Sequence, residues 1–347
     1  MPPGQLLEPS LTESTFVAAA LASGLRTDGR SFNQSRDISI KFGEELGSCS
    51  VAIQGTRVQT SVRATLVPPR SDRPYEGFLQ LTTDISPMAG TEYDTSGGAT
   101  SSARNREILF DRLLEKAIRR TEALDRESLC VIAGEQVFQI HLTIHLLSDC
   151  GAALDAAVLC SMLSLRHFRR PDFTIEDGKV TLYGEDERVG VPLAIHHTPL
   201  CVSFAIFEIQ SQEAKMDEHY DDDDVRREEE RDEEEQDALA PSRDEADDPT
   251  SRPKPSSNAA TIAASADRTV ALLDPSQLEE TLCDSKLVLV LNAQREICVL
   301  DKAGGAPLDA DKLLETLKAG LLRVKELSER VEAELKRDRE VRIVEVV

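Results

Sequence analysis

Residues 127–208 decide how this chain folds, because four sequence patterns follow one another there. The first, ESLCVIAGEQVFQIHLTIHLL (127–147), alternates apolar and polar residues around a turn at Ala133-Gly134-Glu135, which is typical of two β-strands. The second, DCGAALDAAVLCSMLSL (149–165), places a glycine turn before an apolar helix that we expect from about Ala152 to His167. A basic stretch, RHFRRPD (166–172), leads to VPLAIHHTPLCVSFAIF (191–207), whose second half predicts a buried strand.

The flanking residues predict three more helices and further strands. Capping-box spacing between Ser10 and Glu13 predicts a short helix that ends at Gly24. A loop over 88–102 precedes a helix expected from about Arg104 to Arg120, and leucines at helical spacing predict a long amphipathic helix over 310–338. Strands are expected within 36–43, 48–55, 57–67, 76–86, 171–178, 179–184, 269–276, 285–293 and 295–305.

Charge and cysteine content limit the class of protein. The net charge is −23, but residues 217–248 hold 18 acids against four arginines, so that this segment carries −14 and the rest of the chain −9. Nucleic-acid binding would therefore require a local basic groove. Seven cysteines without a Cys-x-x-Cys pair favour a reduced protein with buried thiols and no zinc site. We expect neither a secretory signal nor a membrane-spanning apolar run in this sequence.

The composition divides the chain into three parts. Residues 1–209 are expected to form the first part of a core, and residues 268–347 its second part together with the C-terminal helix. Residues 210–267 are rich in Asp, Glu, Ser, Pro and Ala and hold too few apolar side chains to fold, which predicts a disordered acidic insertion.

The order of these patterns resembles the RNase PH family, from LRTDGRSF (25–32) to LNAQREICVL (291–300). HHTPLCVSF (196–204) is similar to the branch that forms the ring of the eukaryotic RNA exosome. The resemblance implies an α+β, RNase PH-type fold (ribosomal protein S5 domain 2-like) with mixed sheets around core helices. Two similar halves of strands around a core helix fit that fold.

The same resemblance implies a function and a set of partners. It implies a non-catalytic subunit of a hetero-hexameric ring that supports 3′→5′ RNA processing and decay, including rRNA maturation and mRNA turnover. The partners implied are other RNase PH-like ring subunits, S1/KH-domain cap proteins, an associated 3′→5′ exoribonuclease and RNA, with no membrane and no cofactor. The implied location is the nucleus, nucleolus and cytoplasm.

Active members of the family need carboxylates that bind magnesium or move a proton at the leaving oxygen. The family places two aspartates six residues apart before a late apolar strand. Here Asp284 can take the second position, but Leu278 stands at the first and can do neither. A slip of one residue would bring in Glu279, so an active phosphate-dependent 3′→5′ exoribonuclease stays open, as does an acidic protein that binds basic partners. The interpretation we favour has no catalytic residue and no metal ligand.

Basic residues around the first long helix are the candidates for RNA contacts. Arg104 and Arg106 precede that helix, where its positive dipole end would attract a phosphate. In an α-helix Arg112, Lys116 and Arg119 share one face, which is either a solvated charged face or, by resemblance, part of an RNA path. By resemblance, Arg63 is a candidate for a second wall of this path.

Two histidines and several apolar strands complete the sequence-based predictions. His141 and His145 share a strand face with Gln139 and Thr143, which favours an exposed or interfacial face over a metal site. The strand VFQIHLTIHLL (137–147) and the apolar stripe of the C-terminal helix offer more apolar surface than one small core needs, which predicts an obligate ring member.

The acidic insertion generates a first testable prediction. Because loop closure entropy grows slowly with length, replacing residues 210–266 by a short Gly-Ser linker should leave the melting temperature and ring assembly nearly unchanged. Differential scanning calorimetry and co-purification with ring subunits measure both quantities. Loss of assembly in the linker variant would show that the segment is a structural element.

Overall fold

The computed structural model describes residues 10–90, 93, 100–176, 179–184, 187–209 and 269–345. The chain divides into two units, one formed by Met1–Ile206 with Ala271–Val347 and the other by Phe207–Val270. The elements below belong to the first unit, except for the ends of two strands that reach the boundary. The predicted acidic insertion lies outside the described residues, so its predicted disorder stays a prediction.

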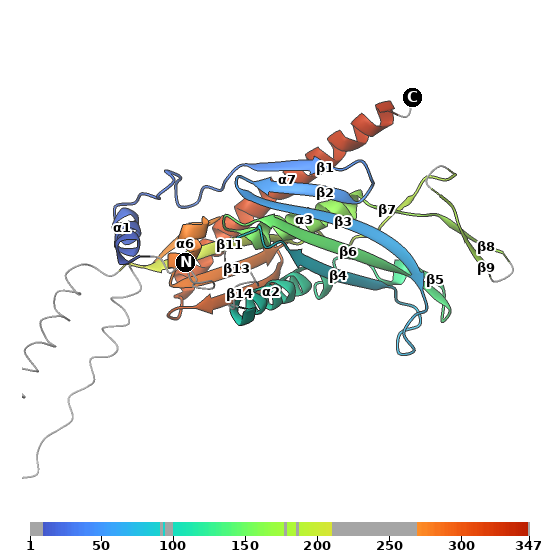
Figure 1. The fold of residues 1–347 in the computed structure, drawn as a ribbon, viewed down its shortest axis with the longest axis horizontal. Helices are drawn as coiled ribbons and strands as arrows, with labels where there is room; N and C mark the ends of the chain where they lie inside the picture. Colours follow the sequence, from blue (N-terminus) through green and yellow to red (C-terminus); the bar gives the residue numbers. More distant parts are fainter. Residues whose placement is uncertain are drawn as a thin grey trace, which may run out of the picture. The chain divides into compact units, whose positions relative to one another are not determined.

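A first sheet runs through the middle of the unit and has the strand order β1-β2-β3-β6-β4, with β5 paired to β6 (Figure 1). Neighbouring strands are antiparallel except β4 and β6, which run parallel. Its strands are β1 (Ile38–Phe42), β2 (Ser48–Ile53), β3 (Thr56–Val67), β4 (Phe78–Ile85), β5 (Cys130–Ile132) and β6 (Gln136–Ser148).

A second sheet has the order β12-β11-β13-β14, with β11–β13 and β13–β14 antiparallel. Two short ribbons pair β7 with β10 and β8 with β9. These strands are β11 (Leu200–Glu208), β12 (Thr269–Leu273), β13 (Ser285–Leu291), β14 (Ile297–Gly304), β7 (Arg169–Arg170), β10 (Val191–Pro192), β8 (Phe173–Glu176) and β9 (Lys179–Leu182).

The helix α3 (Ala153–His167) is the centre of the core. Thirteen of its residues are buried, many of them alanines or other small side chains that let the helix approach its neighbours closely. One side packs on β2 and β3, where the hydroxyl of Thr60 donates to the carbonyl of Cys160 at 3.2 Å. Toward the second sheet, Asp155 accepts hydrogen bonds from the backbone and hydroxyl of Ser203 at 2.8 and 2.6 Å.

The other helices lie around these layers. The long helix α7 packs on β13 and α3, and its Gly320 lies close to the side chains of Leu289 and Leu291. These helices are α1 (Leu11–Ala22), α2 (Thr100–Leu114), which continues as the π-helix η2 (Glu115–Arg119), the 3-10 helix η3 (Glu127–Leu129), α6 (Gln277–Leu282) and α7 (Ala310–Glu345). None of the helices in the described ranges is long and apolar enough to span a lipid bilayer.

The α+β, RNase PH-type fold class is confirmed, and so are most of the predicted elements. The capping box at Ser10 is present, and Gly24 follows α1 with a φ of +80°. Two helix ends were wrong: α2 begins at Thr100, inside the expected loop, and α7 continues to Glu345 instead of ending at 338. The helix α6 was not predicted, although Ser276 and Glu279 form a capping box there.

The strand β6 lies inside the sheet, and the side chains of its apolar face are fully buried in the core of the chain itself. That face therefore needs no partner subunit to cover it. The prediction that its apolar surface reflects ring assembly was wrong, because β3 and β4 flank the strand and helices cover its core side.

A buried ionic cluster joins the N-terminal segment to the residues before β13. Arg26 donates to both carboxylate oxygens of Glu279, at 2.9 and 2.6 Å, and to the carbonyls of Leu273 and Asp274 at 2.9 and 3.1 Å. Arg26 is only 4% exposed and Glu279 is fully buried. The guanidinium thus fills its donor sites with one carboxylate and two carbonyls, as a buried charge requires.

Asp274 is the second anion of this cluster. Its carboxylate accepts hydrogen bonds from the backbone N–H of Arg36 at 2.7 Å, from the Arg36 guanidinium at 2.6 Å and from Arg30 at 3.3 Å. Burial on its own would lower the pKa of Arg36, but the hydrogen bonds and charge of Asp274 raise it above its usual range. Asp274 also has a φ of +51°, so its backbone is held in a conformation that most residues avoid.

The turn before α3 is the third segment of the chain that takes part in the cluster. Arg36 donates to the carbonyls of Cys150 and Gly151, each at 2.9 Å. Gly151 has a φ of +95°, and a Cβ at this position would lie 2.5 Å from the carbonyl oxygen of Pro275. Only glycine satisfies both the turn and this close approach, so the glycine turn seen in the sequence is a packing requirement.

A substitution in the cluster gives a stability prediction. Glu279→Gln removes the anion that neutralises buried Arg26 and should lower the free energy of unfolding by about 3–5 kcal/mol. Glu332→Gln is the matched control, because Glu332 pairs with Arg166 on the surface and its side chain is 64% exposed. The control should cost about 0–1 kcal/mol. Chemical denaturation measures both, and equal losses would contradict a structural role for the cluster.

Candidate functional site

The position of the expected acid pair holds a leucine on a short helix. Leu278 lies on α6 with 38% of its surface exposed, and Asp284 lies exposed just before β13. The backbone N–H of Asp284 donates to the carbonyl of Ile206 at 3.1 Å, which fixes the turn that leads into the strand. One carboxylate therefore stands where a magnesium-binding pair would need two.

The neighbouring glutamates are engaged within the chain. Glu279, which a slip of one residue would bring into the pair, is buried against Arg26 and also caps α6. Glu280 accepts from the backbone N–H of Ala152 at 2.5 Å and from the ammonium group of Lys286 at 2.7 Å. The slip considered from the sequence therefore does not place a solvent-facing carboxylate beside Asp284.

Glu280 also occupies the N-terminal end of α3. This 15-residue helix directs its positive dipole end and its first N–H groups toward the turn at Gly151. Such an end commonly binds a phosphate, but here a carboxylate of the same chain accepts from Ala152. Asp149 on the other side of the turn accepts from the N–H of Gly151 at 2.9 Å and from the hydroxyl of Tyr93 at 2.7 Å.

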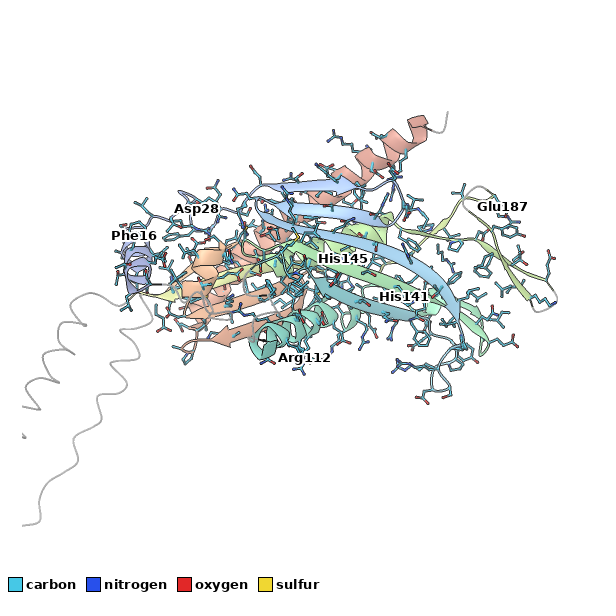
Figure 2. The ribbon with its side chains drawn as sticks, in the orientation of Figure 1. Phe16, Asp28, Arg112, His141, His145 and Glu187 are labelled. Carbon is cyan, nitrogen blue, oxygen red and sulfur yellow. The ribbon has the colours of Figure 1, made fainter. Side chains whose placement is uncertain are left out.

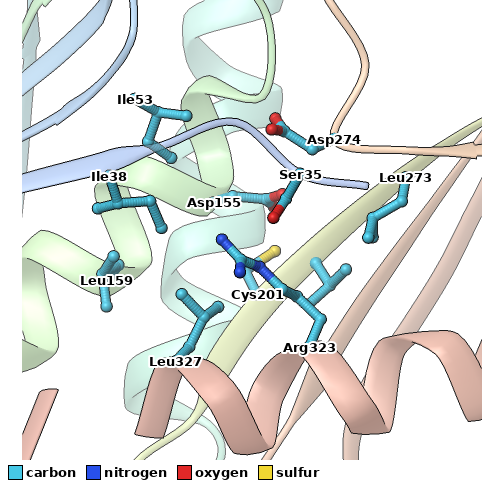
Figure 3. Close-up of a pocket in the computed structure, with 11 residues that line it drawn as sticks. Ser35, Ile38, Ile53, Asp155, Leu159, Cys201, Leu273, Asp274, Arg323 and Leu327 are labelled. Carbon is cyan, nitrogen blue, oxygen red and sulfur yellow. The ribbon is translucent and has the colours of Figure 1, made fainter. Parts of the chain in front are cut away.

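A small cavity lies close to these residues, between α3, β11 and α7 (Figure 3). It has a volume of about 20 Å³, which is room for about one water molecule. Figure 3 shows Arg323 reaching from α7 toward Asp155, with Cys201 beside it. Burial raises the pKa of Asp155 to about 6, against hydrogen bonds from Ser203 and Cys201 that lower it. The cavity is too small for a nucleotide or a phosphate group.

The predicted basic face of the first long helix is divided in the structure. Arg112 points outward from α2 (Figure 2), Lys116 donates to Asp301 of β14 at 3.1 Å, and Arg119 pairs with Glu115. Because residues 115–119 form a π-helix, the α-helical spacing that would align the three side chains is interrupted. The prediction of one common face was wrong for this reason.

Arg104 and Arg106 lie inside α2 rather than ahead of it. The helix begins at Thr100, so Arg104 is its fifth residue and is exposed, while Arg106 is half-buried. The prediction that both lie before the N-terminus of the helix was wrong, and the dipole argument that rested on it fails.

Arg63 lies on the opposite face of the first sheet from α2. It is exposed and pairs in register with His141 of β6, whereas the neighbouring Val62 faces the core with α3. α2 contacts α3 and therefore lies on that core side. Within one chain, Arg63 and the α2 residues do not line the same surface.

The outer face of this sheet is polar, as the alternation of β6 predicted. His141 lies 3.2 Å from the hydroxyl of Thr65, and His145 lies 3.1 Å from the carboxylate of Asp84 (Figure 2). In the described part of the chain, no three His, Cys, Asp or Glu side chains come together to hold a metal ion. The histidines are therefore part of a hydrogen-bonded polar surface.

Two grooves flank η2, and both follow the edge of a sheet. The groove along β14 has a volume of about 720 Å³ and is lined by Lys116, Arg120 and His197. The groove along β4 has a volume of about 1020 Å³ and is lined by five arginines and five carboxylates. The arginines are Arg70, Arg73, Arg119, Arg120 and Arg126, and the carboxylates are Asp72, Glu76, Asp111, Glu115 and Glu122.

Four arginines of these grooves were not among the predicted site residues. Arg70 and Arg73 come from the loop after Pro68-Pro69, and Arg120 and Arg126 follow η2. Arg120 lines both grooves and joins them. The sequence offered no signal for this arrangement, because the parallel pairing of β4 with β6 is what brings the two segments together.

Comparison with known proteins agrees with the fold. Residues 34–171 match the family described as 3′ exoribonuclease family, domain 1, and residues 259–322 match its domain 2. The chain resembles the Archaeoglobus fulgidus exosome with RNA bound to the active site (TM-score 0.62, 19% identity, 92% of this chain and 97% of that chain). It also resembles an archaeal exosome core (TM-score 0.60, 19% identity, 92% and 96%). At this identity the two structures show the fold alone.

Curated relatives are closer in sequence. Exosome complex component RRP45 of Saccharomyces cerevisiae is 32% identical over 336 residues, which cover 97% of this chain and 94% of that protein. Exosome complex component RRP45 of Homo sapiens is 32% identical over 332 residues, which cover 95% of this chain and 61% of that protein. The chain belongs to the 3′ exoribonuclease, or RNase PH, family and within it to the group of exosome complex component RRP45.

Proposed function

We propose that this chain is a non-catalytic ring subunit of an exosome that supports 3′→5′ RNA processing and decay, including rRNA maturation and mRNA turnover. Kinship along nearly the whole length with exosome complex component RRP45 supports ring membership. The observation that carries the non-catalytic role is the acid pair, where Leu278 replaces one carboxylate. Glu279, Glu280 and Asp274 cannot replace it while they hold Arg26, Ala152 and Arg36.

The partners in this proposal are the other RNase PH-like subunits of a hetero-hexameric ring, S1/KH-domain cap proteins and an associated 3′→5′ exoribonuclease. The ring would act in the nucleus, nucleolus and cytoplasm. The chain itself would need no cofactor, and its part would be structural, with RNA passing along its basic side chains on the way to the nuclease.

The candidate RNA contacts are Arg112 and Lys116, with Arg104, Arg106 and Arg119 nearby on the same helical segment. Arg112 is exposed, so its guanidinium is available to a phosphate from a strand in a channel. Arg63 belongs to this proposal only if the RNA also passes the polar face of the sheet, because it lies across the sheet from α2. Contacts of this kind hold the RNA backbone without reading sequence.

An active exoribonuclease is the main alternative, and phosphorolysis tests it. The purified chain, alone and with its ring partner, should release no nucleoside diphosphates from RNA in the presence of phosphate and magnesium, because half of the acid pair is missing. In any complex that does degrade RNA, Asp284→Asn should leave the rate unchanged. Nucleoside diphosphate release that Asp284→Asn abolishes would establish this chain as the enzyme.

RNA binding by the assembled ring tests the path. The double substitution Arg112→Gln and Lys116→Gln should weaken binding and reduce the slope of log K against log salt by about 0.7 for each lost phosphate contact. Lys325→Gln with Lys336→Gln is the matched control, because both lysines are exposed on α7, away from the grooves. An equal effect of the two pairs would mean that residues 112 and 116 form only a solvated surface.

A further inference from the structure

In the described part of the chain, the two larger sheets have four edge strands, and the chain covers two of these edges with its own groups. Along β1, Arg330 donates to the carbonyl of Ile38, and Arg342 donates to the carbonyls of Gly43 and Glu44 just beyond the strand. Both arginines come from α7, which thereby binds one carbonyl at the start of β1 and two just after its end. An unpaired edge would otherwise offer free N–H and C=O groups to another chain.

The edge at β12 is covered in a similar way. The backbone N–H of Leu273 donates to the carbonyl of Phe32 at 2.9 Å, and Arg26 donates to the carbonyl of Leu273 at 2.9 Å. The N-terminal segment therefore provides both a backbone partner and a side-chain partner at this end of the second sheet.

The two remaining edges, β4 and β14, are open and lie on the same side as α2 (Figure 1). Along its eight residues, β4 pairs only with β6, and no other described residue forms a backbone hydrogen bond with Phe78–Ile85. Its sequence, FLQLTTDI, contains neither the proline nor the lysine that commonly blocks a free edge. At β14, the ammonium group of Lys116 of η2 donates to the side-chain carboxylate of Asp301, a contact that does not bind the backbone groups of the strand.

The groove along β4 has the electrostatics of a protein-binding surface. Its five arginines are matched by five carboxylates, and ion pairs join Arg73 to Glu76, and Arg126 to Glu76 and Glu122, at 3.1–3.3 Å. A groove without net positive charge does not concentrate phosphates, because nucleic-acid affinity depends on uncompensated cations. A polypeptide that carries both signs of charge suits it better.

We infer that β4 is the strand to which a neighbouring RNase PH-like ring subunit adds an extended segment, seated in the groove between β4 and η2. This inference rests on the proposed ring membership and identifies the surface that serves it. Eight residues of strand extend about 26 Å, which is room for a pairing segment of about five to eight residues. Main-chain hydrogen bonds would supply affinity, and the mixed charges of the groove would select the partner.

Amide hydrogen exchange tests the inference on the unmodified protein. Exchange is measured for the chain alone and for the chain assembled with RNase PH-like ring subunits. Amides within 78–85 should slow by about tenfold or more on assembly, whereas those of the covered strand β1 should not change. Assembly that leaves 78–85 unchanged, or that protects only β14, would overturn the inference and leave the proposed function intact. If no ring subunit binds the chain, the proposed ring membership and this inference both fail.

A pair of variants tests the same point by affinity. Gln80→Lys with Thr82→Lys places two lysines on the open strand, and Gln59→Lys with Ser61→Lys places two on the same sheet face at the interior strand β3. The edge pair should weaken association with the ring partner by about tenfold or more, and the interior pair should have little effect. The melting temperature of each isolated variant verifies its fold. Equal weakening by both pairs would place the interface on the face of the sheet and overturn the inference.

Discussion

The fold depends on the charge pairing between Arg26 and Glu279, two residues that lie 253 positions apart in the sequence and are both buried. A buried arginine without its carboxylate would cost several kcal/mol, so the N-terminal segment and α6 stabilise each other. Asp274 and Arg36 repeat the arrangement and add the turn at Gly151. Three distant segments thereby meet at the N-terminal end of α3, the helix on which the core is built.

The same cluster supports the proposed non-catalytic role, because it engages the carboxylates around the acid pair. A carboxylate that acts on RNA must reach solvent and substrate, whereas Glu279 and Asp274 neutralise buried arginines. Glu280 takes the position that an anion would take at the end of α3. Phosphate chemistry would therefore compete with interactions that hold the fold together. Ring membership and RNA contact do not compete with them, because the grooves and Arg112 lie at the surface.

The sequence predicted the strands and core helix well because their signals are local. The alternation in β6 and the apolar run of α3 each follow from one stretch of residues. The buried cluster beside the acid pair was harder to predict from the sequence. The roles of Arg26, Arg30 and Arg36 depend on partners more than 200 positions away. The π-helix after Leu114 carries no local signal, and it separates Lys116 from Arg119. Arg63 illustrates a further limit, because only the sheet register shows on which side of the molecule a strand residue lies.

Residues before and after the acidic segment form one core, which the buried ionic cluster holds together. A specific protease site placed between residues 240 and 241 allows the purified protein to be cut there, and size-exclusion chromatography then shows whether the two pieces separate. We expect the two pieces to elute together as one folded particle. Glu279→Gln should make the cut protein dissociate or unfold in milder denaturant than the cut parent. Pieces that separate without denaturant, or a cut protein whose stability is indifferent to Glu279→Gln, would contradict it.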